Sequence, residues 1–246
     1  MILPVELWAA IGAIALAAGT LPSVYFALTE PENRRYYAIL AAITAIAAVS
    51  YTLTSQGIGT LSVDGASFYT PRYVDWLLTT PLLILYMTLL CKPGKQIYGL
   101  LIGLDVALIL LGIAAIFTTG TLSLALFGAG TLAYLALAYL LVVELPARAT
   151  FETDRVAMVF TKLRNVTVVL WTMYPIVWLL APVGYGYLLP NTEMMVVVYL
   201  DIITKVGFAV FALLGRDALN PLADDALAMD AGGDDGESTA SPNLAD

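Results

Sequence analysis

Long apolar segments follow one another along most of the chain, separated by short polar connections. A helix of about 20 mostly apolar residues is long enough to cross the hydrocarbon core of a bilayer. Barrel strands do not fit, because they are about ten residues long and alternate polar with apolar positions. The pattern predicts an all-α membrane protein, a bundle of seven transmembrane helices with short loops. The predicted helices cover roughly residues 5–28, 37–56, 73–91, 97–117, 121–143, 158–183 and 193–214.

The connection between the second and third predicted helices, residues 56–70, has a different pattern. Glycines lie on either side of two alternating apolar residues, Leu61 and Val63. Short alternating runs bounded by glycine are typical of β-hairpins. We therefore expect a small hairpin between these helices.

Composition agrees with a membrane protein and excludes several functional classes. Apolar residues make up 60% of the chain and charged residues 12%, whereas soluble domains average about 25% charged. Histidine is absent and Cys91 is the single cysteine, which rules out histidine-ligated metals, histidine bases and an intrachain disulfide. The isoelectric point of about 4.4 argues against nucleic-acid binding. We expect neither a metal site nor enzymatic turnover of an external substrate.

The formal net charge of −8 is unevenly distributed. Residues 215–246 contain eight acidic residues and one arginine, so this segment carries −7 and the rest of the chain is nearly neutral. Acidic segments rich in Ala, Gly and Ser do not bury enough apolar surface to fold. The sequence therefore predicts a seven-helix domain over residues 1–214 and an acidic, disordered tail over residues 215–246.

The basic residues predict the orientation of the bundle. Loops rich in Lys and Arg stay on the cytoplasmic side of a membrane. Seven crossings place the two termini on opposite sides, and nine of the eleven basic residues fall on the side of the C-terminus. We expect a multi-pass protein of the cell membrane with an extracellular N-terminus and a cytoplasmic tail. The nine residues are Arg34, Arg35, Lys92, Lys95, Arg148, Arg155, Lys162, Arg164 and Arg216.

The two remaining basic residues, Arg72 and Lys205, lie in or beside predicted membrane spans. Asp201 precedes Lys205 by one helical turn, and Asp75 follows Arg72 by nearly one turn. A charge near mid-bilayer costs about 2.5–3.5 kcal/mol on insertion scales. Two interpretations remain open: a buried ion pair that locks helices together, or a lysine amine that condenses with an aldehyde and uses the carboxylates as counter-ions.

Aromatic residues favour the second interpretation. Trp171, Tyr174 and Trp178 are spaced by three and four residues, so they share one helical face near the middle of the sixth span. Such a face is often plain helix packing. Together with Trp76 beside Asp75, however, it indicates a pocket for a rigid, elongated apolar ligand with one polar end.

In these residues the chain resembles the archaeal microbial rhodopsins, which are retinal-binding seven-helix proteins. The matching segments are residues 72–82, residues 164–171 with Tyr174, Pro175 and Trp178, and residues 200–208. The resemblance implies all-trans retinal bound covalently to Lys205 as a protonated Schiff base. It also implies a counter-ion complex of Asp75, Asp201 and Arg72, in which Asp75 is the photochemical proton acceptor. The implied retinal contacts are Trp76, Thr79, Leu108, Gly112, Phe127, Trp171, Tyr174 and Trp178.

Within this family the resemblance to proton pumps is incomplete. In bacteriorhodopsins a second carboxylate, eleven residues after the counter-ion, reprotonates the Schiff base; the matching position is Tyr86. Of the two glutamates at the pumps' release site, one is matched by Glu193 and the other by Val183. A phenol with a pKa of about 10 is a poor proton donor, so the pump machinery is only partly present.

Sensory rhodopsin II gives a better match. In that group a threonine before the lysine bonds a tyrosine on the sixth helix, and another tyrosine faces the transducer. Thr204, Tyr174 and Tyr199 occupy these positions. The resemblance implies a photosensor that signals by retinal isomerisation and Schiff-base proton transfer to Asp75, with a membrane-embedded transducer for phototaxis.

Asp105 in the fourth span is a departure, since an acid at this position is usual in pumps. An outward light-driven proton pump and a middle rhodopsin with mixed sensor and pump properties therefore stay open as alternatives. We expect membrane lipids and a transducer as partners, with a homo-oligomer as a further option and no nucleic acid. Thr54 and Thr172 are interpreted as helix-packing hydroxyls and receive no role.

Overall fold

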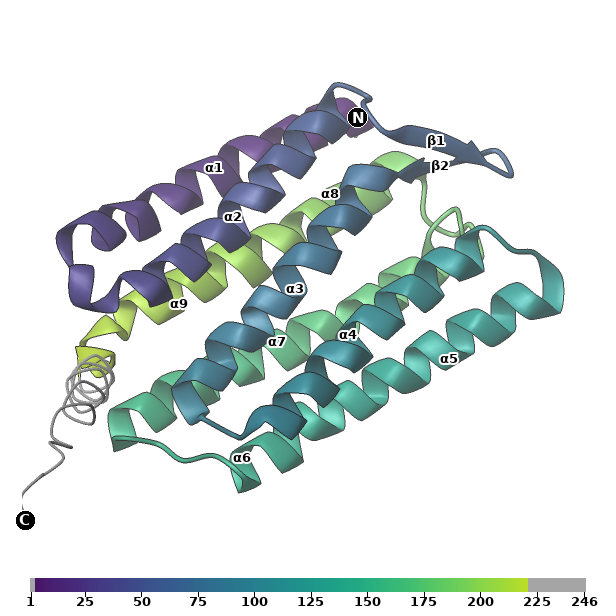
Figure 1. The fold of residues 1–246 in the computed structure, drawn as a ribbon. Helices are drawn as coiled ribbons and strands as arrows, with labels where there is room; N and C mark the ends of the chain where they lie inside the picture. The colour runs from purple at the N-terminus through teal and green to yellow at the C-terminus, as the bar shows by residue number, and fades with distance from the viewer. Residues whose placement is uncertain (1–2, 221–246) are drawn as a thin grey trace, which may run out of the picture.

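The computed structural model describes residues 3–220. Seven helical rods are long and apolar enough to cross a membrane, and they lie side by side in one bundle (Figure 1). The predicted fold class is thereby confirmed. The acidic tail predicted to be disordered begins at residue 215, and most of it lies outside the described residues. The described body nevertheless continues past residue 214, because η4 (Arg216–Ala218) follows and Leu219 is buried.

The rods follow the predicted segments closely. The first four are α1 (Val5–Thr29), α2 (Arg34–Ser55), α3 (Thr70–Cys91) and α4 (Lys95–Ile116), with a short 3-10 turn, η1 (Pro31–Asn33), before α2. The fifth combines α5 (Gly120–Tyr139), the π-helical η2 (Leu140–Glu144) and α6 (Leu145–Ala147). The sixth is α7 (Asp154–Leu180), and the seventh combines α8 (Pro190–Asp201), the π-helical η3 (Ile202–Gly207) and α9 (Phe208–Leu214).

The expected hairpin is present between α2 and α3. Strands β1 (Thr60–Val63) and β2 (Ala66–Tyr69) pair antiparallel. Asp64 and Gly65 join them with φ angles of 49° and 82°, and two consecutive positive φ angles are typical of the type I′ turn that suits the twist of paired strands. We call this end of the bundle, which also holds the start of α1, the hairpin end, and the opposite end the tail end (Figure 1).

The seventh rod differs from the regular helix expected over residues 193–214. Its middle is a π-helix that contains Lys205. Each π turn holds one more residue than an α turn, and such segments are frequent at functional sites. The apolar pattern alone does not distinguish the two kinds of helix, so this feature was missed.

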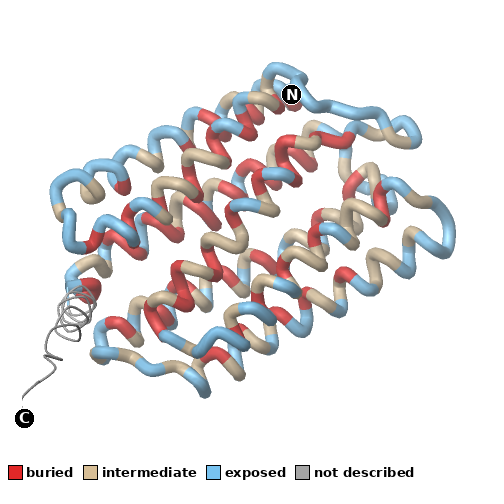
Figure 2. The backbone as a smooth tube through the Cα atoms, viewed as in Figure 1, coloured by how far each residue is buried: buried red, intermediate tan, exposed pale blue. Residues whose placement is uncertain are grey.

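Burial follows the logic of a membrane protein. Buried positions face the interior of the bundle and exposed positions face outward (Figure 2). Large apolar side chains on the outer surface, such as Ile14 and Leu132, are about 70% exposed. Several charged and hydroxyl side chains are instead buried in the interior. A surface of this kind suits lipid, and the polar interior marks the region where function is expected.

Candidate functional site

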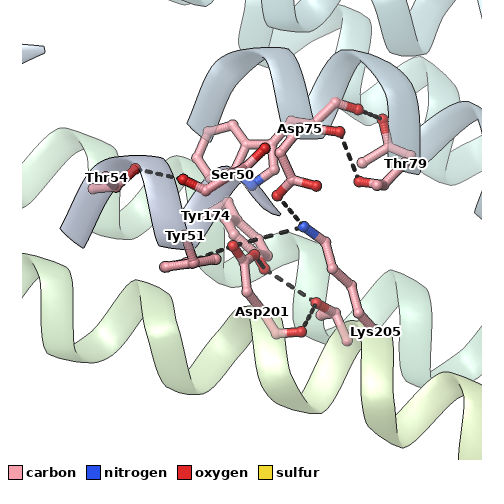
Figure 3. A network of polar contacts seen from close by, with 11 residues as sticks. Ser50, Tyr51, Thr54, Asp75, Thr79, Tyr174, Asp201 and Lys205 are labelled. Carbon is pink, nitrogen blue, oxygen red and sulfur yellow. Dashed lines mark hydrogen bonds and ion pairs between the residues drawn. The ribbon is translucent and has the colours of Figure 1, made fainter. Parts of the chain in front are cut away.

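Lys205 lies in the interior of the bundle and is 2% exposed. Its Nζ forms an ion pair with Oδ2 of Asp75 on α3, and Oδ2 of Asp201 lies 3.8 Å from the same nitrogen. Figure 3 shows the lysine pointing across the bundle toward both carboxylates. The structure therefore brings together the predicted cation and two predicted acids, which come from two rods distant in sequence.

Two tyrosines hold Asp201. The hydroxyl of Tyr51 on α2 donates a hydrogen bond of 2.6 Å to Oδ2, and the hydroxyl of Tyr174 on α7 donates one of 2.5 Å to Oδ1 (Figure 3). Both oxygens of this carboxylate thus accept phenolic protons. Tyr51 was not predicted to have this role, because its contact with Asp201 joins residues 150 positions apart.

Arg72 lies apart from the two aspartates. Its Nη2 donates to Oε1 of Glu193 at 2.9 Å, and both side chains are less than 10% exposed. The rings of Tyr73 and Trp76 lie against the guanidinium. Between residues 3 and 220, no hydrogen bond or ion pair joins Arg72 to either aspartate.

The charged centre therefore consists of two groups. Lys205 with Asp75 and Asp201 carries a formal charge of −1, and Arg72 with Glu193 carries zero. The charges of the four residues expected from the sequence, Arg72, Asp75, Asp201 and Lys205, sum to zero. Glu193 is a fifth charged residue, so the two groups together carry a formal charge of −1. Oδ1 of Asp75 is buried and has no hydrogen-bond partner in the described chain, so this carboxylate keeps one acceptor atom available.

A cavity with a volume of about 130 Å³ begins beside Lys205. Sites that bind small molecules are lined mostly by apolar and aromatic side chains. Aromatic and aliphatic side chains form most of the wall of this cavity. Its lining includes these predicted residues: Trp76, Leu108, Gly112, Phe127, Trp171, Tyr174, Trp178, Asp201, Thr204 and Lys205.

One predicted contact residue lies elsewhere. Thr79 is fully buried and its hydroxyl donates to the carbonyl oxygen of Asp75 at 2.8 Å (Figure 3). It is not part of the cavity wall. The next residue, Thr80, does line the cavity and donates to Oδ2 of Asp105 on α4 at 2.7 Å. This pairing was not predicted, since the sequence does not indicate how α3 and α4 face each other.

The far part of the cavity is shaped by stacked rings and one glycine. The rings of Phe127 and Trp178 stack with centroids 5.2 Å apart and an interplanar angle of 21°. A Cβ added to Gly112 would lie 3.4 Å from the indole of Trp178. The indole of Trp178 therefore lies close to α4 at Gly112, and the cavity has a flat aromatic wall.

Comparison with known proteins agrees with this arrangement. The family model described as bacteriorhodopsin-like protein matches residues 4–219. The chain belongs to the bacteriorhodopsin-like family. It is 46% identical over 222 residues to sensory rhodopsin-2 of Halobacterium salinarum, an alignment that covers 90% of this chain and 93% of the relative.

Two further comparisons extend over similar lengths. Sensory rhodopsin-2 of Natronomonas pharaonis is 36% identical over 237 residues, which is 96% of each chain. The crystal structure of thermophilic rhodopsin from Rubrobacter xylanophilus superposes with a TM-score of 0.85 at 37% identity, covering 90% of this chain and all of that one. Both the seven-helix fold and the multi-pass membrane character are shared with this family.

The predicted signalling residues of this bacteriorhodopsin-like protein fall into two places. Tyr174 lies with its hydroxyl 3.2 Å from Oγ1 of Thr204, so these two residues join α7 to the seventh rod beside the cavity. Tyr199 lies on the outer surface, is 53% exposed, and packs against the ring of Trp8 at 5.8 Å. Tyr174 and Thr204 are therefore in contact with the cavity, whereas Tyr199 is on the outer surface of the bundle.

Tyr86 occupies a tightly packed part of this bacteriorhodopsin-like bundle, on the tail side of the cavity. It is fully buried between the rings of Tyr36 and Phe208, and its hydroxyl has no hydrogen-bond partner in the described chain. Within residues 3–220, no buried carboxyl group lies on the tail side of the Thr80–Asp105 pair. The described part of the chain thus offers no buried carboxyl group as a proton donor on this side of the cavity.

Proposed function

We propose that this protein is a retinal-binding light receptor of the sensory type, with all-trans retinal attached to Lys205. The observation that carries the proposal is a buried lysine amine, paired with Asp75, at one end of an elongated aromatic cavity. The residues present fit such a ligand. The cavity wall is mostly apolar, and Asp201, Thr204 and the amine of Lys205 lie close together in it.

When bound, retinal supplies light absorption, isomerisation and a protonated nitrogen at its junction with Lys205. Oδ2 of Asp75 is placed to accept a proton from that nitrogen, because it is the acid in direct contact with Nζ. Asp201 lies farther away and both its oxygens accept bonds from tyrosines. Asp75 therefore has more acceptor capacity left for that proton than Asp201 has.

A titration of the retinal-free protein with all-trans retinal tests the attachment. We expect a visible absorption band in the parent, no band in Lys205→Ala, and a band of parental intensity in Lys95→Ala, whose lysine is exposed at the tail end. A band that survives in Lys205→Ala would refute the attachment site. Absence of any band in the folded parent would refute retinal binding itself.

Three observations support a sensor over a pump. The tail side of the cavity lacks a buried carboxyl donor, so return of a proton from that side is slow and the light-activated state is long-lived. Tyr174 and Thr204 join the cavity to α7, where Pro175 interrupts backbone bonding and provides a hinge. Two relatives that span nearly the whole chain are named sensory rhodopsin-2.

We further propose that the tail end faces the cytoplasm, since nine basic residues lie on that side. The partner is then a membrane-embedded transducer that contacts the outer face around Tyr199 and responds to a tilt of the tail-end half of α7. A transducer co-expressed with the protein should lose its light response when Thr204 is changed to Ala. An intact response in that variant would refute this route of coupling.

An outward proton pump is the second candidate, favoured by the buried Arg72–Glu193 pair between Asp75 and the hairpin end. Light-dependent pH measurements on cells that contain retinal and no transducer separate the two functions. A sensor should give little or no sustained acidification of the medium. Strong acidification that disappears in Asp75→Asn would establish the pump instead.

A further inference from the structure

Tyr134 on α5 joins the cavity to α7. The residue is 7% exposed and forms part of the cavity wall beside Trp171 and Tyr174. Its hydroxyl lies 2.6 Å from Oγ1 of Thr172 and 3.2 Å from the carbonyl oxygen of Val168, both on α7. One end of this side chain therefore faces the cavity, while the other is bonded to a neighbouring helix.

The bonded segment of α7 lies next to its weakest backbone position. Pro175 has no N–H, so the carbonyl of Trp171 receives no helical bond from residue 175. Thr172 is three residues before Pro175, on the tail side of this interruption. Its own hydroxyl donates to the carbonyl of Val168 at 2.8 Å, so the hydroxyl of Tyr134 completes a small bonded group on the tail side of Pro175.

The surroundings offer no replacement for these bonds. Thr172 is exposed on the outer face of the bundle, which in a membrane faces lipid. Hydrocarbon cannot donate or accept hydrogen bonds, so a broken contact between Tyr134 and Thr172 leaves polar groups unsatisfied. Hydrogen bonds between membrane helices average about 0.6 kcal/mol and reach about 1.7 kcal/mol, enough to bias a balanced conformational equilibrium.

We propose that Tyr134 is a positioning residue: through Thr172 and Val168 it holds the tail-end half of α7 against α5 in the resting state. The inference rests on the proposed function, in which that half of α7 tilts about Pro175 after illumination. Because the ring of Tyr134 lies in the cavity wall, a change of shape in the cavity acts on the same side chain that restrains the helix. The bond loosens as α7 moves and re-forms as the resting state returns.

Two variants isolate this bond from ordinary packing. Tyr134→Phe keeps the ring in the cavity wall and removes only the hydroxyl, and Thr172→Val removes the partner hydroxyl on a side chain of similar shape. Tyr139→Phe on the same helix is the matched control, since Tyr139 is 55% exposed at the outer surface. The double variant Tyr134→Phe/Thr172→Val tests whether the two hydroxyls act as one unit.

The first measurement is the lifetime of the light-activated, deprotonated state of the retinal-loaded protein, followed by flash absorption. Each single variant should lengthen it by about two- to tenfold, because one interhelical hydrogen bond no longer favours the resting state. The double variant should match the singles, and Tyr139→Phe should match the parent. An unchanged lifetime in the single variants, or multiplied effects in the double variant, would overturn the proposal.

The second measurement needs no retinal. Hydrogen–deuterium exchange of α7 peptides in the retinal-free protein should be about two- to tenfold faster between residues 168 and 179 in Tyr134→Phe than in the parent. Equal exchange in the two proteins would show that the hydroxyl does not restrain α7 and would overturn the proposal. This arm also separates the two hypotheses: absence of a visible band with retinal refutes the proposed function, whereas exchange alone decides whether the restraint exists.

Discussion

The two halves of the bundle, on either side of Lys205, are held together by different interactions. Toward the hairpin end, buried charges and phenols form two groups, one of Lys205, Asp75, Asp201 and Tyr51 and the other the Arg72–Glu193 pair. Toward the tail end, the interior consists of packed rings and aliphatic side chains around Tyr86. Among the described residues, the ion pairs of that half are partly exposed, as in the Lys92–Glu152 pair.

This difference separates two tasks that a light receptor combines. Under the proposed function, protons would move within the group around Lys205, where donors and acceptors lie within hydrogen-bond distance. The tail half contains no comparable group in the described residues, so we expect it to transmit a change of shape rather than protons. Four substitutions test the contrast, in order of decreasing expected effect.

Asp75→Asn should have the largest effect, because it removes the acceptor in contact with Lys205. A positioned proton acceptor contributes about 10²- to 10⁴-fold to a transfer rate, so formation of the deprotonated state should slow by about 10²-fold or more in flash-absorption measurements. Asp64→Asn in the exposed hairpin turn is the control and should behave like the parent. An unchanged rate in Asp75→Asn would mean that the proton leaves by another route.

Glu193→Gln should strongly destabilise the hairpin half. The substitution leaves the Arg72 guanidinium buried without its carboxylate, and breaking a buried pair in this way costs about 3–5 kcal/mol. Unfolding of the detergent-solubilised protein measures the loss. The double variant Arg72→Gln/Glu193→Gln should recover a large part of it, since no lone charge stays buried. A loss below about 1 kcal/mol in the single variant would show that other groups compensate for Glu193.

Tyr86→Asp should change the character of the tail half by adding a proton donor. Recovery from the deprotonated state should become roughly tenfold faster, less than the 10²- to 10⁴-fold typical of general acids, because the new carboxyl enters a tightly packed region. Tyr86→Phe is the control and should recover at the parental rate, since the hydroxyl of Tyr86 has no partner in the described chain. Equal recovery in both variants would mean that proton return is limited elsewhere.

Glu152→Gln should have the smallest effect. The Lys92–Glu152 pair is partly exposed, with side chains 38% and 33% accessible, and exposed ion pairs contribute about 0.2–1 kcal/mol. The same unfolding assay should show a loss within this range. A loss as large as that of Glu193→Gln would contradict the contrast between a charged hairpin half and a tail half stabilised by apolar packing.

The features that could be predicted from the sequence are those encoded locally. The apolar runs predicted the seven rods, and Asp64-Gly65 lies in the segment where a hairpin was expected. The spacing of Asp201 and Lys205, one helical turn, predicted a charged site. Pairings between distant rods were not predicted. The Arg72–Glu193 contact spans 121 residues, and the apolar pattern does not determine which face of α3 meets α8.

The second limit was the geometry within a rod. Thr79 and Thr80 are neighbours in the sequence, yet only Thr80 faces the cavity. The orientation of α3 decides between them, and this orientation results from the packing of several helices at once. Tyr134 shows the same limit, because its importance depends on the position of α7.

The π-helix η3 has a consequence for protein engineering. An α-helix rotates by about 100° per residue, and a π turn includes one residue more than an α turn, so α9 is rotated relative to a regular continuation of α8. A helical wheel drawn through residues 190–214 would therefore misassign the faces of Phe208 and the residues after it. Deletion of a single residue from η3, such as Ile203, would turn this segment into a regular helix of ordinary pitch. An alignment of this rod with a regular transmembrane helix therefore needs a one-residue gap within η3.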